Sequence, residues 1–432
     1  MGSVLKMEDA AENQRTFSAE TLMSRDSSAP NPFRTKLRRL AMRLIAATLG
    51  LVVALGFCEV ILHALGISFP LPYQTDPHCG TKLQPHFSGL FTKEGRGKVT
   101  TTGDGRRDRE YAFTKEPNTF RIAILGDSYA EALQVQLEET FWSVLQVELQ
   151  ACGPLAGKKL EVLNFGVSGF GTAQELQMLE HYVWDYQPDL VLVAFLTGND
   201  ISDNSASLST NPVRPFYYLA ENQLRLDNSF QQHPTYIAAS SPWGKLKTRM
   251  INSFRSLQLL REISAQLRNR SAAASQTHPT ELGLDPIYES PQTTTWSDAW
   301  NVTEKILQTM HLRSREKGSQ FCVVTLTNAI QVEPDPKIRV KLQQSLGVEN
   351  LFYPDFRVVD IGKRHGFRVF TLAPKMQAEA EKNQRYFHGF PNTKLGTGHW
   401  NQEGHRRAGQ IMATEICQWL SQAQGTNVSP KP

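Results

Sequence analysis

The sequence predicts an α/β protein in which a parallel sheet, covered by helices on both faces, follows one transmembrane helix. Two observations predict the sheet: short apolar runs alternate with helical patterns from residue 118 onward, and polar turns stand where those runs end. The third observation is an uncharged apolar stretch near the amino terminus, which is long enough to span a membrane. Because 432 residues exceed the usual size of one domain, we expect one large domain with additional segments.

The composition is that of an ordinary globular protein. Hydrophobic residues make up 40% and charged residues 20% of the chain, and the net charge is only +4. Residues 1–66 contain eight Lys and Arg against six Asp and Glu, which leaves the remainder near neutral. Since neither a basic patch nor a binding signature for nucleic acid is present, we exclude DNA and RNA as partners.

The first 66 residues predict a tail and an anchor. Residues 1–33 are polar and lack periodic apolar residues, which predicts a disordered cytoplasmic tail. Residues 34–66 are the predicted transmembrane anchor, in which a basic cluster precedes an uncharged run from Leu44 to Cys58. The positive-inside rule then places the amino terminus in the cytoplasm and the domain in the periplasm, the extracellular space or a lumen. The alternatives are a signal peptide cleaved near Ala64-Leu65-Gly66 and a buried helix. The basic cluster consists of Arg34, Lys36, Arg38, Arg39 and Arg43.

The remaining chain divides into a lead-in, a core with an insertion, and a short tail. Residues 67–117, rich in Pro, Gly and Thr, predict a stem that holds the domain away from the membrane. The domain is predicted over residues 118–424, with a disordered tail at 425–432. We expect strands at 121–125, 160–163, 190–196, 321–326 and 367–372, and helices at 141–149, 172–183, 300–317, 355–365 and 401–420.

The alternation of strand and helix fails between about residues 205 and 294. This stretch contains aromatic patches and a basic, helix-like piece from Lys245 to Arg270. We interpret it as an insertion that covers or borders the active site, with a partly disordered surface loop as the alternative.

Five cysteines occur without a Cys-x-x-Cys pair or a zinc-like spacing. Cys58 lies in the apolar run and Cys322 in a predicted strand, where each is expected to act as a small hydrophobic residue. Cys79, Cys152 and Cys417 can pair if the domain is exported, and the sequence does not choose among them.

Four polar blocks come in a fixed order, each after a strand or at the start of a helix. Gly126-Asp127-Ser128 ends the first core strand, and Asn164 to Gly171 follows the second. Thr197 to Asp200 follows the third, and Gly398-His399 precedes the last helix. Open parallel sheets keep their ligands at the carboxyl ends of the strands, so Ser128 is a candidate nucleophile. A plain turn is the alternative, because Gly, Asp and Ser are common turn formers.

The four blocks together resemble the markers of the SGNH, or GDSL-type, hydrolase family. The family's serine, glycine, asparagine and histidine correspond here to Ser128, Gly169, Asn199 and His399. The resemblance covers roughly residues 118–420.

An upstream segment extends this resemblance. Gly105-Arg106-Arg107-Asp108 is similar to the Gly-Phe-Arg-Asp segment that precedes the first block in membrane-anchored members of the family. The resemblance implies a flavodoxin-like three-layer α/β/α sandwich with a parallel sheet, which is the SGNH hydrolase fold.

The resemblance also implies a role for each marker. His399 is the expected base, because a serine hydroxyl needs a group that takes its proton during attack. The oxyanion hole is expected to consist of the backbone N–H of Ser128, the backbone N–H of Gly169 and the side-chain amide of Asn199. Gly166 is the competing glycine, and Asp127 is expected to support the site by shaping the turn.

The triad acid is absent from its usual place. Related sequences carry an aspartate two or three residues before the histidine, where this chain has Gly396 and Thr397. No Asp or Glu lies between Glu381 and His399. Three alternatives remain: a Ser-His dyad oriented by a backbone carbonyl, which we favour as the most economical, an acid from elsewhere in the fold, or lost hydrolytic activity.

We predict neither a metal nor a cofactor. His399 and Glu403 share a helix face, but His405 is turned away from them, and no metal motif is present. We expect His405 and Trp400 to pack the start of the last helix.

The sequence therefore predicts a membrane-anchored serine esterase that cleaves a carboxylic ester through a Ser128 acyl-enzyme. Its expected substrate is an ester-bearing small molecule or an acylated glycan, such as an O-acetyl glycan. One alternative is an O-acyltransferase that acts on an envelope or extracellular glycan. Another is a catalytically degenerate SGNH domain that binds a glycan or a protein partner.

Overall fold

The computed structural model describes residues 32–273 and 285–425. It divides into an amino-terminal unit that ends at Cys58 and a large unit that begins at Glu59. The predicted tails at 1–33 and 425–432 therefore lie almost wholly outside the described residues. Their described residues, Pro32, Phe33 and Gly425, are helical.

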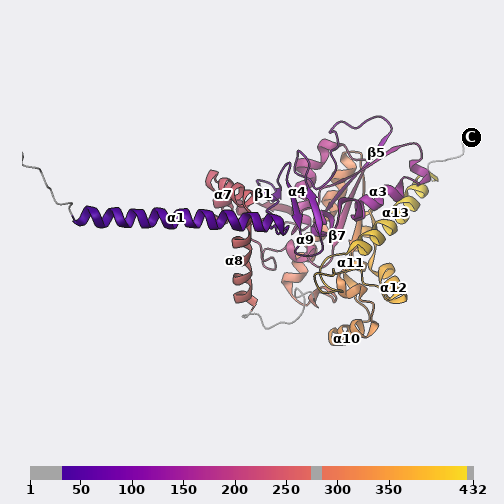
Figure 1. Ribbon diagram of the computed structural model, residues 1–432. Coiled ribbons are helices and arrows are strands. Elements are labelled where there is room, and N and C mark those ends of the chain that lie inside the picture. Colours follow the sequence, from indigo (N-terminus) through magenta and orange to yellow (C-terminus); the bar gives the residue numbers. More distant parts are fainter. Residues whose placement is uncertain (1–31, 274–284, 426–432) are drawn as a thin grey trace, which may run out of the picture. The chain divides into compact units, whose positions relative to one another are not determined.

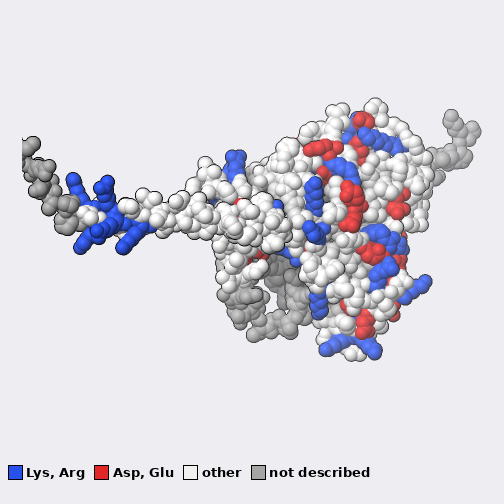
Figure 2. Space-filling model, viewed as in Figure 1, with Lys and Arg blue, Asp and Glu red and all other residues white. Residues whose placement is uncertain are grey.

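The amino-terminal unit consists of most of helix α1, Pro32–Ala64, which begins and ends two residues before the predicted anchor. Its segment Phe33–Ala64 is long and apolar enough to cross a membrane, although a signal sequence has the same properties. At about 1.5 Å per residue the helix is about 50 Å long, more than the roughly 30 Å of a hydrocarbon core. Figure 2 shows the Lys and Arg side chains gathered at its start, followed by a stretch without charge.

The large unit is built on a five-stranded parallel sheet with the order β11-β10-β7-β5-β6. Figure 1 labels two of these strands, β5 and β7, which are neighbours in the sheet. Counted along the chain within this sheet, the order is 2-1-3-4-5, which is the flavodoxin-like arrangement. The predicted fold class is thereby confirmed. The strands are β5 (Thr119–Gly126), β6 (Lys159–Asn164), β7 (Leu190–Leu196), β10 (Gln320–Leu326) and β11 (Arg368–Thr371).

Helices cover both faces of this sheet. In β5, Ile122 and Ile124 pack into the core beneath α3, α12 and α13, whereas Ala123 and Leu125 pack into the core beneath α4, α9 and α11. Burial on both faces explains why the strands read as nearly continuous apolar runs. The covering helices are α3 (Phe141–Leu149), α4 (Thr172–Met178), α9 (Thr294–Glu316), α11 (Tyr353–His365), α12 (Ala373–Asn383) and α13 (Gln402–Gly425).

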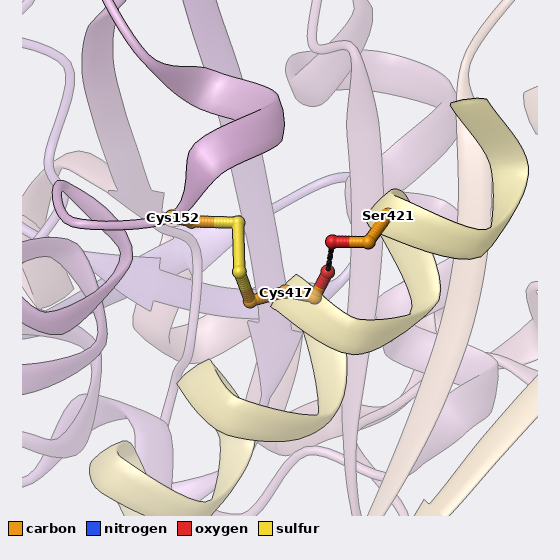
Figure 3. Close-up of a disulfide and its surroundings, with 3 residues drawn as sticks. All are labelled: Cys152, Cys417 and Ser421. Carbon is orange, nitrogen blue, oxygen red and sulfur yellow. Dashed lines mark hydrogen bonds between the residues drawn. A yellow bond between two sulfur atoms is a disulfide. The ribbon is translucent and has the colours of Figure 1, made fainter. Parts of the chain in front are cut away.

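A disulfide joins Cys152, just after α3, to Cys417 in α13 (Figure 3). It links positions 265 residues apart on the same side of the sheet. The sequence did not decide which of Cys79, Cys152 and Cys417 form a pair. In the structure the third of them, Cys79, is a buried free thiol. Since disulfides persist mainly in oxidising compartments, this bond fits a domain outside the cytoplasm.

The predicted stem forms two β-hairpins that are part of the domain. Leu83 and Val99 in these hairpins are buried, and so is Arg107 just beyond them. Residues 67–117 therefore pack on the sandwich, where we had expected a separate spacer. The strands are β1 (Tyr73–Asp76), β2 (Gly80–Leu83), β3 (Ser88–Phe91) and β4 (Gly97–Thr100).

The predicted insertion is a hairpin followed by three helices, and its residues 274–284 lie outside the described part. The hairpin consists of β8 (Phe216–Ala220) and β9 (Gln223–Asp227). The helices are α6 (Pro234–Ser240), α7 (Pro242–Ser253) and α8 (Arg255–Ala273). Three further helices are α2 (Ser128–Glu131), α5 (Asp200–Asp203) and α10 (Pro336–Leu346).

Candidate active site

Ser128 is the first residue of α2, and one residue, Asp127, separates it from the end of β5. From Thr119 to Val135 it is the one residue that is not buried. Asp127 caps α2, because its carboxylate accepts a hydrogen bond from the Tyr129 N–H at 2.9 Å. The sharp turn from strand to helix thus presents the Ser128 hydroxyl at the carboxyl edge of the sheet.

His399 lies on the turn before α13, and its ring reaches Ser128. Its Nε2 is 2.8 Å from Ser128 Oγ, which is within reach for proton transfer. Two contacts fix this turn on the domain. The Tyr129 hydroxyl donates to the Gly398 carbonyl at 3.1 Å, and the Trp400 side chain is fully buried. His405 is also buried and stacks on Phe141, so the expected packing role of these two residues is confirmed.

A carboxylate that the sequence did not reveal contacts the other nitrogen of His399. Glu94, in the turn between β3 and β4, places Oε2 at 2.5 Å from His399 Nδ1. Its Oε1 accepts a hydrogen bond from the His399 backbone N–H at 2.7 Å. Gly398 has a φ of +73°, and a Cβ there would collide with the Glu94 carboxylate, so the residue before the histidine has to be glycine.

The favoured hypothesis, in which a backbone carbonyl orients His399 of a Ser-His dyad, is therefore wrong about the group that orients the histidine. Nδ1 of His399 faces a carboxylate that comes from elsewhere in the fold, which was the second alternative. Glu94 precedes the histidine by 305 residues and lies before the first family block. The weak signal in the sequence was an acid in a short Gly-containing turn, Lys93-Glu94-Gly95.

Two other segments make hydrogen bonds to the backbone of the turn that carries Glu94. The Gly95 N–H donates to the Asn392 side chain at 2.9 Å, and the Asn392 amide donates to the Thr92 carbonyl at 3.0 Å. The Arg96 N–H donates to the Gln134 carbonyl, just beyond α2, at 3.0 Å. The hairpin is thus tied both to the histidine's own loop and to the nucleophile's turn.

Electrostatics favour an ion pair between Glu94 and His399. Burial raises the pKa of Glu94, but the hydrogen bonds from His399 and its charge outweigh burial. The pKa of Glu94 therefore lies below the ordinary value of a glutamate. Burial lowers the pKa of His399, but hydrogen bonding to Glu94 and the charge of Glu94 outweigh it and raise its pKa. The carboxylate is therefore placed to stabilise a protonated imidazole.

The second block distinguishes between its two glycines. Gly166 donates its N–H to the Asn164 side chain at 3.0 Å, and a Cβ there would collide with Ala130. Gly169 has a φ of +76° with open space around its Cβ position, and its N–H donates to no described residue. Gly166 therefore has a packing role, while the Gly169 N–H is available to a ligand.

Asn199 stands beside the nucleophile's turn. Its side-chain Nδ2 donates to Asp127 Oδ2 at 3.0 Å, which uses one of its two amide hydrogens. Burial raises the pKa of Asp127 to about 6, although the hydrogen bonds from Tyr129 and Asn199 oppose the shift. Asp127 thus contacts both the backbone of the turn and the side-chain amide of Asn199.

Arg107, in the segment that resembles Gly-Phe-Arg-Asp, fixes the end of α2. Its fully buried guanidinium donates to the carbonyls of Glu131 at 2.7 Å, Val135 at 2.6 Å and Ala132. Asp108 beside it accepts from the Asn164 N–H at 2.8 Å, at the end of β6. The lead-in thereby contacts the end of α2 and the end of β6, two of the segments that carry the site.

Arg214 of the insertion contacts the second block. Its guanidinium donates to the Gly169 carbonyl at 2.7 Å and pairs with Asp203 at 3.0 Å. The described part of the insertion therefore borders the second block.

Comparison with known proteins places the chain near several solved structures of low similarity. No family model matches the chain, and no curated protein does. An acetyl xylan esterase, AlAXEase, is 12% identical, with 69% of this chain and 100% of the other covered and a TM-score of 0.34. A lipase/acylhydrolase from Enterococcus faecalis is 13% identical, with 70% and 97% covered and a TM-score of 0.35. An acetylxylan esterase from Geobacillus stearothermophilus is 13% identical, with 70% and 96% covered and a TM-score of 0.34.

TM-scores this low give no support to an argument about activity. The fold rests on the strand order described above, and the chemistry rests on the contacts among Ser128, His399 and Glu94.

Proposed function

We propose that this protein is a membrane-anchored serine esterase of the SGNH type. The observation that carries the proposal is the continuous chain of contacts from Ser128 Oγ to His399 Nε2, at 2.8 Å, and from His399 Nδ1 to Glu94, at 2.5 Å. A nucleophile, a base and an acid that orients the base recur in this geometry among enzymes that catalyse acyl transfer. The missing acid was the main support for a degenerate binding domain, and Glu94 removes that support.

Each residue has a defined role in the proposed reaction. Ser128 Oγ attacks the ester carbonyl carbon while His399 Nε2 takes its proton, and Glu94 stabilises the resulting imidazolium. The tetrahedral intermediate collapses when the C–O bond to the alcohol breaks and His399 returns the proton to the departing oxygen. Water then attacks the acyl-enzyme by the same route and releases the acid and Ser128.

The oxyanion of each intermediate is held by three donors. These are the N–H groups of Ser128 and Gly169 and the remaining amide hydrogen of Asn199, each worth on the order of a hundred- to a thousand-fold in rate. Asp127 keeps the amide of Asn199 in place.

Location narrows the substrate class. The basic cluster before the uncharged run of α1 supports a cytoplasmic amino terminus, and the disulfide supports an oxidising compartment for the domain. The proposed substrate is therefore an ester outside the cytoplasm, carried by a small molecule or by an acylated glycan such as an O-acetyl glycan.

The test is ester turnover by the full-length protein in detergent, with acetyl and longer acyl esters. We expect turnover in the wild type and a loss on the order of a million-fold in Ser128→Ala and in His399→Ala. Unchanged turnover in Ser128→Ala would exclude the assignment. Addition of a glycan acceptor distinguishes hydrolysis, which releases free acid, from transfer, which yields an acylated glycan.

A further inference from the structure

Helices α7 and α8 of the insertion carry apolar side chains that point away from the protein. Trp243 on α7 is 70% exposed and Leu260 on α8 is 55% exposed. The two helices are packed against each other, and exposed apolar side chains grouped on neighbouring elements mark an interaction site. We call this set the α7–α8 apolar surface, and it consists of Trp243, Leu246, Met250, Phe254, Leu260 and Ile263.

The polarity of α8 is reversed relative to a helix that packs on a water-soluble core. Its inward positions Ser256, Gln258 and Glu262 are polar and buried, whereas Leu260 and Ile263 are exposed. The buried polar groups have partners: Gln258 accepts from the Phe69 N–H at 2.8 Å, and Glu262 pairs with Lys93 at 2.7 Å. The outward face of α8 therefore suits apolar surroundings.

The last turns of α1 lie at the junction of α7 and α8, within the large unit. The carboxylate of Glu59 accepts hydrogen bonds from the backbone N–H groups of Arg255, at 2.7 Å, and Ser256, at 2.9 Å. The first N–H groups of a helix lack partners within it, so Glu59 caps α8. Arg255 in turn donates from its side chain to the Leu62 carbonyl at 3.0 Å.

A bilayer that contains the uncharged run of α1 therefore has its surface next to α8. The run ends at Cys58, one residue before the capping carboxylate of Glu59. One helical residue rises about 1.5 Å, which is far less than the thickness of a headgroup layer. The residue that caps α8 therefore lies close to the end of the hydrocarbon region. Along the chain, the residue that caps α8 thus directly follows the end of the uncharged run.

The charge on α7 favours lipid over a second copy of the chain. The helix contains three basic residues, Lys245, Lys247 and Arg249, and no acidic one. Amphipathic helices of this composition lie in the interface of membranes that contain anionic lipids, and tryptophan is enriched at that depth. Two copies of α7 placed face to face would bring like charges together.

We propose that the α7–α8 apolar surface lies in the headgroup–acyl boundary of the leaflet from which α1 emerges. The proposal rests on α1 as a membrane anchor, as proposed above, and does not require catalysis. It gives the domain a second attachment beside the span. Because Glu262 of α8 pairs with Lys93, the neighbour of Glu94, that attachment holds the active-site edge at a fixed height above the bilayer.

Tryptophan fluorescence of the full chain in vesicles tests the proposal directly. The protein is reconstituted into phosphatidylcholine–phosphatidylglycerol vesicles whose acyl chains carry bromine near the headgroup, a quencher of nearby indoles. The anchor contains no tryptophan, so quenching cannot come from the span. We expect Trp243→Phe to remove most of the bromine-quenched emission, and the matched control Trp419→Phe, on α13, to leave it in place.

A second variant and a second lipid sharpen the result. Leu246→Glu combined with Met250→Glu keeps Trp243 and is expected to lose most of its quenching. In vesicles of phosphatidylcholine alone the wild type is expected to be quenched less than in the anionic mixture. Equal quenching in the wild type and in Trp243→Phe overturns the proposal, and so does a cross-linked dimer through α7 with Trp243 unquenched.

The same samples separate this proposal from the others. Resistance of the protein to alkaline extraction reports on the α1 anchor, and turnover of a soluble ester reports on the proposed esterase. Loss of Trp243 quenching with both of these intact assigns the failure to the α7–α8 apolar surface alone.

Discussion

Two segments outside the alternating core, residues 67–117 and the insertion after Asn204, use charge and apolar surface in opposite ways. The first buries the Arg107 guanidinium against the end of α2 and places the Glu94 carboxylate against His399. The second exposes apolar groups, among them Trp243 on α7 and Leu260 on α8, and α8 buries the polar side chains of Gln258 and Glu262. The difference teaches that one addition places a carboxylate beside His399, where the proposed reaction needs an acid, whereas the other leaves apolar side chains exposed on the described domain.

The largest effect is expected at Glu94. Glu94→Gln keeps the size of the side chain but removes the charge that stabilises the imidazolium, so kcat/KM should fall by roughly a hundred- to ten-thousand-fold. Ester turnover of purified protein measures this. Thr397→Asp, at the family's usual acid position, should stay near the wild-type rate, and so should Trp243→Phe. Full turnover in Glu94→Gln would contradict the conclusion that residues 67–117, unlike helices α7 and α8, contribute to the reaction.

The next largest effect concerns stability. Arg107→Met leaves three buried carbonyls without their donor, which should lower the free energy of unfolding by about 3 kcal/mol or more. Burial lowers the pKa of Arg107 to about 10, so the guanidinium is charged at neutral pH. Arg249→Met, on the exposed side of α7, should change stability by no more than about 0.5 kcal/mol. Denaturant midpoints that shift equally in both variants would contradict the account.

The disulfide provides a reference for the two segments, because it links the end of α3 to α13 within the core of the sandwich. Reduction of Cys152–Cys417 frees a loop of 265 residues and should lower the free energy of unfolding by about 2–4 kcal/mol. The thermal midpoint with and without reductant measures this, with Cys152→Ser combined with Cys417→Ser as the matched variant. A midpoint that is insensitive to reductant would argue that the pair is not formed.

The smallest expected effect is a shift in pH dependence. His399 acts as a base only when neutral, and its pKa is raised above 6.5 because Glu94 outweighs burial. Activity should therefore rise with pH through an apparent pKa above 6.5. In Glu94→Gln the raising charge is lost while burial remains, so the acid limb of kcat/KM should move to lower pH. Superimposable limbs in the two proteins would show that Glu94 does not act on His399.

The sequence predicted the core well because its strands are buried on both faces. The predicted strand at 190–196 coincides with β7, and the helix predicted at 355–365 lies within α11. Ser128 and His399 could be paired in advance only through the resemblance to the SGNH family, whose four ordered blocks flank elements that are clear from their patterns. The structure brings their side chains together but does not by itself assign their roles.

Glu94 and the exposed face of α8 could not be predicted, for one physical reason. Each depends on how a segment without strong periodicity docks against residues far away in the chain. Glu94 meets a histidine 305 positions later, and the face of α8 is set by the partners of Gln258 and Glu262 in the lead-in. Local patterns carry no information about such contacts.

The rate at which Ser128 reacts with a fluorophosphonate probe tests the central claim most directly, since it requires the nucleophile, the base and the acid together. We predict that the folded wild type is labelled at Ser128, that Glu94→Gln is labelled at least about a hundred-fold more slowly, and that Thr397→Asp is labelled at the wild-type rate. A folded wild type that is not labelled, or a Glu94→Gln variant labelled as fast as the wild type, would contradict the assignment of Ser128, His399 and Glu94 as a catalytic triad.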